Sequence, residues 1–490
     1  YHVGNLRDAL DSGTLLPAGF RYPSLSHWLC LAALAPEAIA GRGAADGSPL
    51  GERLLAALAA PETLLRIRTL FLVVCSLSLL PVLALVLRWR GRVFEAFVAA
   101  ALLGTSWEVA YHARWLAPDG VVMTFAALTL FGSIHACLRP GRSWPLVVAA
   151  LAAGFACGTK WTAGLLLLPV LMAGWIGTAG LPRALRLRRL AGLVAGFGVA
   201  YLLTTPGTLL DPGAVLRALE LQQGTYASGH LGHTVARGPG HLLKVFEYLG
   251  LVLFSHYPLF ALACFGLSLV GAHAIFREAK TLAVVFASFP VAYLLFFSLY
   301  PVMIPRNYLV LAPFLAVLAA RGVSEIRDRL PGRMLRGVFV AAVSAMLLID
   351  AAWLVQAGES IRSADGRKHL HGLAAYLDAH PDTRFAASEQ IRGQLRRLDG
   401  RVRENVTSGP LREVDEVVFY ASESYPYVVA LRPRYDLSRA WFGPYEVNFN
   451  FYPSWLGSDR IVVLPAERYP RRPGLPPDRV PEKLRPGRMQ

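Results

Sequence analysis

Three short polar segments interrupt long apolar runs in this sequence, and each carries side chains that could do chemistry. The first segment runs from Trp107 to Asp119 and also contains Glu108, His112 and Arg114. Asp119 directly precedes an apolar run, where a carboxylate can cap the N–H groups of a helix or serve as the acid of a metal or phosphate site. Ionisable groups beside such runs are expensive, so the segment is a functional candidate.

Each of the other two segments contributes one cation. Lys160 stands between Cys157 and Thr162, and Arg306 follows Pro305, which is placed to start a helix. A compact ammonium suits a phosphate oxygen, and a guanidinium can bind a phosphate through two parallel hydrogen bonds. The alternative for both side chains is an interfacial position, with the charged head reaching towards water.

A longer polar stretch, residues 207–245, adds Tyr226, His230 and His233. Two histidines three residues apart could face one way on a helix and bind a metal, but no carboxylate stands beside them. Hydrogen bonding or a part in a lid is therefore the favoured interpretation of this pair.

The elements that must position these residues are membrane-spanning helices. Of the 490 residues, 54% are hydrophobic and 17% are charged, and the mean hydropathy is +0.42, which excludes a soluble cytoplasmic enzyme and a disordered chain. Runs of about 20 apolar residues, the length that crosses a bilayer, predict ten spans. They cover residues 69–87, 93–111, 120–138, 144–159, 161–180, 190–206, 246–276, 281–304, 305–320 and 337–356.

Basic residues predict the orientation of these spans. Five connections hold 16 Lys and Arg residues, whereas the connections that alternate with them hold six. Because cytoplasmic loops of membrane proteins are enriched in Lys and Arg, the basic set is expected inside, with Asp119, Lys160 and Arg306 outside. The net charge of +16 then reflects topology and tail composition, and nucleic-acid binding is not expected.

Three regions follow from this topology. Residues 1–62 are expected outside, with Ser24 to Ala35 as a helix on the membrane surface and Trp28 as its anchor. Residues 63–356 form the spanning body, and residues 357–490 are charged and predict an exported α/β domain. That domain is expected to contain a helix at 366–380, strands at 384–388, 416–421 and 460–465, a polar helix between the first two strands, and an unstructured Pro- and Arg-rich tail from Pro470.

In their order along the chain, these residues resemble the integral-membrane glycosyltransferases of the GT-C fold. Within that fold, the resemblance is to the branch of protein O-mannosyltransferases and lipid A aminoarabinose transferases. It covers residues 1–356 and rests on Tyr1 to Gly13, Phe20 to Leu25 with His27-Trp28, Asp119, Gly158-Thr159-Lys160, and Pro305 to Tyr308 followed by Leu311 and Pro313.

The resemblance implies a fold class and an activity. The fold would be an α-helical polytopic membrane protein, to which the small C-terminal exported α/β domain is added. The donor would be a polyprenyl-phosphate-linked sugar and the acceptor a hydroxyl of a lipid, glycan or protein, with inversion at the sugar carbon. The location would be a bacterial inner membrane with the site on the periplasmic side. The family's acidic pair, which supplies the base, should lie just before Tyr1, so we expect that an N-terminal segment with the first span precedes this chain.

The implied site residues divide into two groups. Asp119, Lys160 and Arg306 would be catalytic, and Lys160, Arg306 or a divalent metal ion held partly by Asp119 would stabilise the departing phosphate. The expected substrate-binding residues are Tyr22, Glu108, His112, Arg114, His230 and Tyr308.

Two other classes of function stay open. A transporter or flippase of lipid-linked saccharides would place polar residues and broken helices at mid-membrane, whereas these residues gather at one face and the sequence shows no internal repeat. A binding protein would use aromatic residues of its exported domain, which could stack on sugar rings or pack that domain. These are Trp441, Phe442, Tyr445, Phe449, Phe451, Tyr452 and Trp455.

Overall fold

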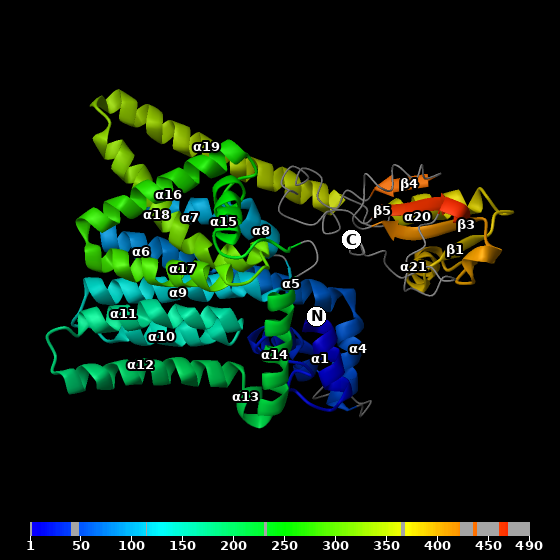
Figure 1. Ribbon diagram of the computed structural model, residues 1–490, viewed down its shortest axis with the longest axis horizontal. Helices are drawn as coiled ribbons and strands as arrows, with labels where there is room; N and C mark the ends of the chain where they lie inside the picture. Colours follow the sequence, from blue (N-terminus) through cyan, green and yellow to red (C-terminus); the bar gives the residue numbers. More distant parts are fainter. Residues whose placement is uncertain are drawn as a thin grey trace. The chain divides into compact units, whose positions relative to one another are not determined.

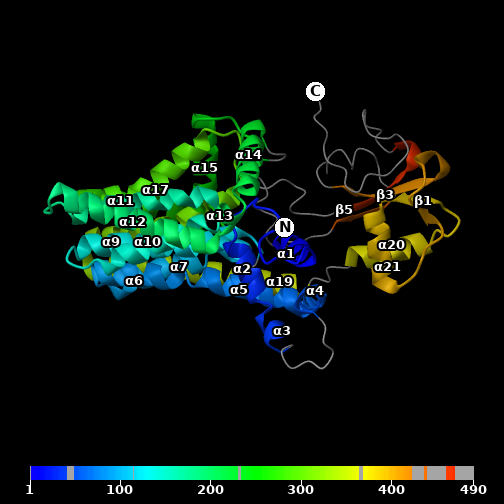
Figure 2. The same ribbon diagram turned by 90° about the horizontal axis from the view of Figure 1, so that it is seen from below.

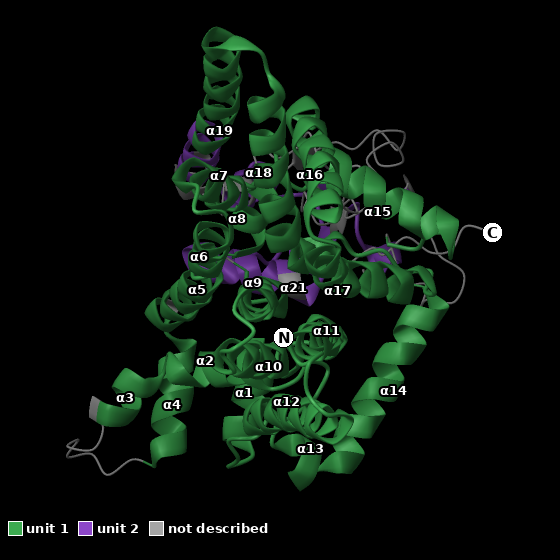
Figure 3. Ribbon diagram, turned by 90° about the vertical axis from the view of Figure 1, so that its left-hand side faces the viewer, with its two compact units in different colours: residues 1–351 green, residues 352–490 purple. Residues whose placement is uncertain are grey.

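The computed structural model (Figure 1, and turned by 90° in Figure 2) describes residues 2–40, 49–113, 115–229, 233–363, 368–421, 435–438 and 460–468. The chain divides into two compact units, Tyr1–Ala351 and Ala352–Gln490 (Figure 3), and the boundary falls within the helix Gly332–Ser363. Unit 1 is built of helices, and unit 2 combines helices with a sheet. The division expected after residue 356 from the sequence stays a prediction, close to this boundary.

Unit 1 begins with four helices that precede its apolar body. They are α1 (His2–Asp11), α2 (Leu25–Ala32), α3 (Ala35–Ala40) and α4 (Leu50–Ala59). The apolar body consists of α5 (Pro61–Ser76), α6 (Leu79–Arg90), α7 (Val93–Gly104), α8 (Trp107–Ala113), α9 (Pro118–Leu138), α10 (Trp144–Cys157), η2 (Trp161–Leu166), α11 (Leu167–Gly177), α12 (Arg183–Thr204), α13 (Gly207–Leu210), α14 (Pro212–Ser228), α15 (Pro239–Leu251), α16 (Pro258–Glu278), α17 (Lys280–Ser298), η3 (Pro305–Leu311), α18 (Ala312–Arg329) and α19 (Gly332–Ser363).

The apolar body contains helices that suit a membrane. Among the described residues, seven helices are long and apolar enough to cross one, or eight if the bent pair α7 and α8 is a single span. Two further apolar helices, α10 and the η2–α11 pair, are shorter. Nine of the ten predicted runs coincide with one of these helices or pairs, and the tenth, at 246–276, overlaps α16 only in part. The predicted fold class, an integral membrane protein with a small C-terminal α/β unit, is confirmed.

One predicted span has a different form in the structure. The apolar run at 246–276 is two helices, α15 and α16, which are separated at residues 252–257. Side chains from the break between α7 and α8 hold this separation, because Ser106 Oγ donates to Leu253 O at 2.6 Å and Trp107 Nε1 donates to Val252 O at 2.7 Å. Hydropathy does not detect such a break, since its hydrogen-bond partners come from a distant part of the chain.

Small residues let the helices of unit 1 approach closely. A Cβ atom on Gly271 of α16 would lie 1.8 Å from Leu318 O, and one on Gly322 of α18 would lie 2.0 Å from Leu267 O. The two helices therefore cross with their backbones in contact, as small residues permit in membranes. Neighbouring helices also cover α9, where 72% of the most apolar window is buried. The first turn of α9 is thus a well-supported position for a functional side chain.

The region before the apolar body packs onto it. Leu6, Cys30 and Phe71 belong to one buried cluster that joins α1 and α2 to α5. The predicted surface helix at 24–35 corresponds to α2, and the Trp28 indole N–H donates to Thr204 O at the end of α12 at 2.9 Å. This donor, which a membrane anchor would offer to lipid headgroups, is therefore satisfied inside the protein.

Unit 2 contains a five-stranded sheet with the strand order β2-β1-β3-β5-β4. β1 pairs in parallel with β2 and β3, and β5 pairs antiparallel with β3 and β4. The elements are α20 (Lys368–Asp378), β1 (Phe385–Ala387), α21 (Glu389–Asp399), β2 (Val406–Thr407), η4 (Leu411–Glu413), β3 (Glu416–Ala421), β4 (Tyr435–Ser438), β5 (Arg460–Pro465) and η6 (Ala466–Arg468). Both predicted helices and all three predicted strands are present, whereas β2 and β4 are too short to produce a recognisable pattern.

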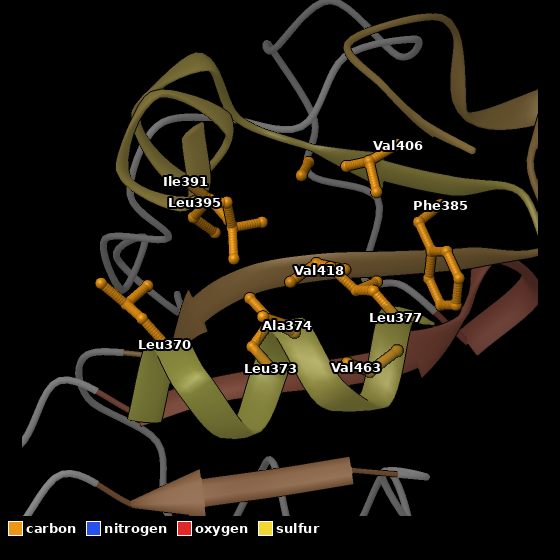
Figure 4. Packing of buried hydrophobic residues seen from close by; sticks show 11 residues of the cluster. Leu370, Leu373, Ala374, Leu377, Phe385, Ile391, Leu395, Val406, Val418 and Val463 are labelled. Atoms are coloured by element: carbon orange, nitrogen blue, oxygen red, sulfur yellow. The ribbon is translucent and has the colours of Figure 1, made fainter. Parts of the chain in front are cut away.

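Alternation along the strands gives the sheet of unit 2 two apolar faces. Phe385, Val418 and Val463 point to the face that α20 and α21 cover, where Leu373 and Ile391 are fully buried (Figure 4). The second face carries Ala386, Val417, Val462 and Leu464. The aromatic residues at 441–455 and the predicted tail from Pro470 lie outside the described residues.

Candidate active site

The first turn of α9 places Asp119 inside the protein, with 3% of its side chain exposed. Its Oδ1 accepts a hydrogen bond from Lys160 Nζ at 2.6 Å. Among the described residues, no backbone N–H donates to the Asp119 carboxylate, and the residue before the helix makes no side-chain cap. The geometry therefore shows an acid that holds the Lys160 ammonium instead of a helix cap, and a role for Asp119 in a metal or phosphate site stays a prediction.

Lys160 reaches Asp119 because the chain is extended where α10 ends. The backbone of Lys160 has φ −153° and ψ 124°, and η2 begins at the next residue. Its Nζ also donates to Asn307 Oδ1 at 2.7 Å, and 9% of the side chain is exposed. The interfacial alternative for Lys160 is therefore wrong, since the ammonium is buried between two acceptors.

Arg306 and Asn307 enter the site from the first turn of η3. Arg306 Nε lies 3.6 Å from Asp119 Oδ2, and the Arg306 side chain is 29% exposed. Asn307 Nδ2 donates to Tyr226 OH at 3.1 Å, so the same amide bridges Lys160 and a residue of α14. Asn307 was not predicted from the sequence as a site residue, although it lies between Arg306 and Tyr308, which were.

One carboxylate, Asp119, faces two cations at this centre, one buried and the other partly open to solvent. An anion beside Arg306 and Lys160 would meet two positively charged donors. A phosphate suits both donors, since the guanidinium offers a planar fork and the ammonium a point charge.

Aromatic side chains form the wall behind Asn307. Tyr293 OH donates to Asn307 O at 2.8 Å, which fixes the backbone that carries the amide. The rings of Tyr226 and Phe297 lie 6.0 Å apart. Burial raises the pKa of the Tyr226 phenol, so this hydroxyl stays protonated and can serve as a neutral hydrogen-bonding group.

Glu108 and His112 form a second buried cluster on α8. Glu108 Oε2 accepts a hydrogen bond from Tyr248 OH at 2.6 Å, and His112 Nε2 lies 3.7 Å from the same oxygen. The two residues are one helical turn apart and so share a face. α8 contacts both α9 and η3, which carry Asp119 and Asn307. The structure therefore brings Glu108 and His112 together on a helix beside the Asp119–Lys160 centre.

The remaining predicted binding residues have different positions. Tyr308 is fully buried, and its hydroxyl lies 2.5 Å from His241 Nε2, so it supports η3 from behind. The Tyr22 ring packs against the ring of His2 on α1, with 5.6 Å between centroids. Arg114 and His230 lie outside the described residues. Substrate contact by any of these residues stays a prediction.

The described residues do not fit a metal ion at Asp119. They contain no group of three or more His, Cys, Asp or Glu side chains that could hold one. Each Asp119 oxygen faces a cation, which makes this carboxylate a poor ligand for a second positive centre. The divalent metal suggested by the sequence therefore has no supporting ligand set in this part of the chain.

The opposite ends of the helices carry other charges. Where α6 ends and α7 begins, Arg90 pairs with Glu278 at 3.0 Å and Arg92 pairs with Asp328. Arg321 pairs with Glu278 as well. These residues come from the connections that are rich in Arg. We call this the arginine end and the end with Asp119 the site end (Figure 1).

Comparisons with known proteins found similar solved structures but no similar sequence family. The sequence matches no protein-family model and no curated protein. The chain is similar to the crystal structure of ArnT from Cupriavidus metallidurans bound to undecaprenyl phosphate, with 16% identity, a TM-score of 0.48, and coverage of 75% of this chain and 61% of that chain. The apo structure of the same protein gives 19% identity, a TM-score of 0.47, and coverage of 75% and 60%.

A third structure is an oligosaccharyltransferase from Archaeoglobus fulgidus in complex with Zn and sulfate. It gives 14% identity, a TM-score of 0.42, and coverage of 82% of this chain and 57% of that chain. The chain thus spans about three fifths of the length of these proteins. ArnT is a lipid A aminoarabinose transferase. At these identities no residue's role is transferred from the likeness.

Proposed function

We propose that this protein is a membrane glycosyltransferase that moves a sugar from a polyprenyl-phosphate donor to an acceptor hydroxyl. The observation that carries the proposal is the buried Asp119–Lys160–Asn307 centre with Arg306 at its more exposed edge. It stands at one end of apolar helices, where the phosphate of a lipid could approach while its polyprenyl chain stays in the bilayer.

In the proposed reaction, Lys160 and Arg306 both stabilise the leaving group. The acceptor oxygen attacks the anomeric carbon, the bond from that carbon to the phosphate oxygen breaks, and the bonding pair leaves with the phosphate. Attack opposite to the leaving group inverts the carbon. The acceptor's proton passes to a general base, which the resemblance places in the first outer loop. Charge grows on the departing phosphate, so preorganised cations stabilise the transition state more than the ground state.

Asp119 has a supporting task in this proposal. With Asn307, it holds the Lys160 ammonium in one place through hydrogen bonds of 2.6 and 2.7 Å. A fixed cation needs no reorganisation when charge develops on the phosphate. Asp119 is thus proposed to position the Lys160 ammonium, and Lys160 and Arg306 to touch the phosphate.

The proposed orientation puts the site end on the periplasmic side of a bacterial inner membrane. It is supported by the asymmetry of basic residues between alternate connections. The connections that carry Arg90, Arg92 and Arg321 would then face the cytoplasm, together with their acidic partners.

The test is binding of polyprenyl phosphate to the full-length protein, followed by transfer from a labelled polyprenyl-phosphate sugar in membranes. Lys160→Met should weaken polyprenyl phosphate binding about tenfold to hundredfold, the value of a hydrogen bond to a charged group. Lys160→Arg should lose less, because it keeps the charge. Lys244→Met is the matched control, since Lys244 is a more exposed lysine that pairs with Glu247 on α15.

Two results would contradict the proposal. One is native polyprenyl phosphate binding by Lys160→Met. The other is movement of the labelled lipid sugar across vesicle membranes without cleavage of the sugar–phosphate bond, which would identify a flippase. The described polar residues favour the transferase, because they gather at one end of the helices instead of mid-membrane.

A further inference from the structure

A cavity of about 470 Å³ lies at the arginine end, beside the connection between α9 and α10. Residues of α11 and α12 complete its walls. Its lining is mostly small and apolar, including Gly177, Gly192 and Leu193, and its charged members are Arg142 and Arg189. The volume falls within the range of about 300–1,000 Å³ that is usual for ligand pockets. It belongs to the opposite end of the helices from Asp119 and Lys160.

The cavity exists because α12 diverges from its neighbours. Towards the site end, α12 packs tightly on α10: a Cβ atom on Gly154 would lie 2.4 Å from Phe197 O, and one on Gly158 would lie 1.9 Å from Thr204 Oγ1. Towards the arginine end, a Cβ atom on Gly174 would still lie 2.9 Å from Leu193 Cδ1, but one on Gly177 or Gly192 would meet no described atom within 4 Å. The helices therefore enclose a wedge that is closed at one end and open at the other.

α12 is poorly covered by the rest of the protein. Only 17% of its most apolar window is buried, against 72% for α9. In a bilayer, an open apolar wedge of this kind is filled by a hydrocarbon chain, because water in it would find few polar partners.

Among the residues that the structure describes, the arginines around the wedge have no acidic partner. Residues 120–210 contain no Asp or Glu. Arg139, Arg142, Arg183, Arg186, Arg188 and Arg189 form no ion pair with a described residue. At the same end, Arg90, Arg92 and Arg321 all do. Arg90, Arg92 and Arg321 are therefore neutralised by described acidic residues, whereas the six arginines around the wedge are not.

We propose that the wedge binds one anionic phospholipid, with its phosphate between Arg142 and Arg189 and an acyl chain between α10, α11 and α12. The guanidinium groups match the phosphate in charge and in hydrogen-bonding geometry. Basic residues just beyond the end of a span attract anionic lipids in the same way. The lipid completes the packing of α12, whose other end is held to α2 by Trp28 and Thr204.

The experiment uses the purified full chain in detergent with phosphatidylglycerol or phosphatidylcholine of identical acyl chains. Native mass spectrometry counts the retained lipid, and we expect one phosphatidylglycerol per chain and no phosphatidylcholine. Arg142→Gln and Arg189→Gln should each lower the affinity for phosphatidylglycerol about fivefold. Arg92→Gln is the charge control, because Arg92 pairs with Asp328 at the same end and should not alter retention.

A second pair of variants tests the acyl chain. Gly192→Leu should abolish retention, since the leucine side chain projects into the wedge. Gly198→Leu, on the same helix but outside the cavity lining, should retain the lipid. If Gly192→Leu lacks native helix content by circular dichroism, the arginine variants at exposed positions still decide the question.

Three outcomes would overturn the proposal. They are equal retention of both lipids, native affinity in folded Gly192→Leu, and displacement of phosphatidylglycerol by inorganic phosphate alone, which would identify an ion site. Lys160→Met should leave retention unchanged, so the lipid site and the proposed transferase can fail separately.

Discussion

The two ends of the membrane helices both carry clustered charges, but they hold them differently. At the site end, Asp119 and Lys160 are 3% and 9% exposed. At the arginine end, each of two pairs keeps an exposed partner: Arg92 and Asp328 are 40% and 43% exposed, and Arg321, which is 2% exposed, pairs with Glu278, which is 41% exposed. Exposed pairs contribute about 0–1 kcal/mol to stability. In a buried pair, the free energy lost when both charges leave water can exceed the free energy gained from their attraction. A buried pair is therefore weak evidence for stability, and in a membrane protein it indicates a function for the charge.

The largest effect is expected at Asp119. Asp119→Ala leaves the Lys160 ammonium buried without its carboxylate, which should lower the free energy of unfolding by about 3–5 kcal/mol. Sugar transfer should fall on the order of a hundredfold or more, because the cation is no longer held at the phosphate. Thermal unfolding in detergent and transfer in membranes check the two effects. Asp119→Asn, which can still accept from Lys160, should be more stable than Asp119→Ala, and equal stability would count against the ion pair.

An intermediate effect is expected at Asn307, which positions the Lys160 ammonium. Asn307→Leu keeps the volume but removes the second acceptor from Lys160 Nζ and the donor to Tyr226. kcat/KM for transfer should fall about tenfold, as for loss of one hydrogen bond to a charged group. A change in kcat larger than the change in donor affinity would show that positioning, and not binding alone, is lost.

The matched control is Asn405→Leu. The Asn405 amide also makes a hydrogen bond, in which it donates to the backbone carbonyl of His380, but it belongs to unit 2. Its transfer kinetics should stay native. Native kinetics in Asn307→Leu as well would remove Asn307 from the proposed site.

The smallest effect is expected at the arginine end. Arg92→Gln removes one exposed partner of Asp328 and should change the free energy of unfolding by less than about 1 kcal/mol. Transfer should be unaffected. A loss of several kcal/mol in thermal unfolding would show that the two ends differ less than their exposed fractions indicate.

Much of the fold could be predicted because its signals are local. Apolar runs marked the helices of unit 1, and alternation marked β1, β3 and β5 of unit 2. Pro258, the first residue of α16, is a local signal for the break at residues 252–257, but the hydrogen bonds from Ser106 and Trp107 that hold the break could not be predicted. Likewise, nothing in the sequence around Trp28 indicates that its indole bonds to Thr204, which is 176 residues away.

The candidate site shows the same division. The sequence by itself determined which residues could serve, because ionisable side chains beside apolar runs are few and stand out: Asp119, Lys160 and Arg306. Only the tertiary structure decided that these residues share one centre, since Lys160 and Asp119 are 41 residues apart and Lys160 and Asn307 are 147 apart. A span confers burial through its own composition, whereas a contact between spans depends on how the helices pack. The packing of α9 against η2 and η3 makes three scattered polar residues one site.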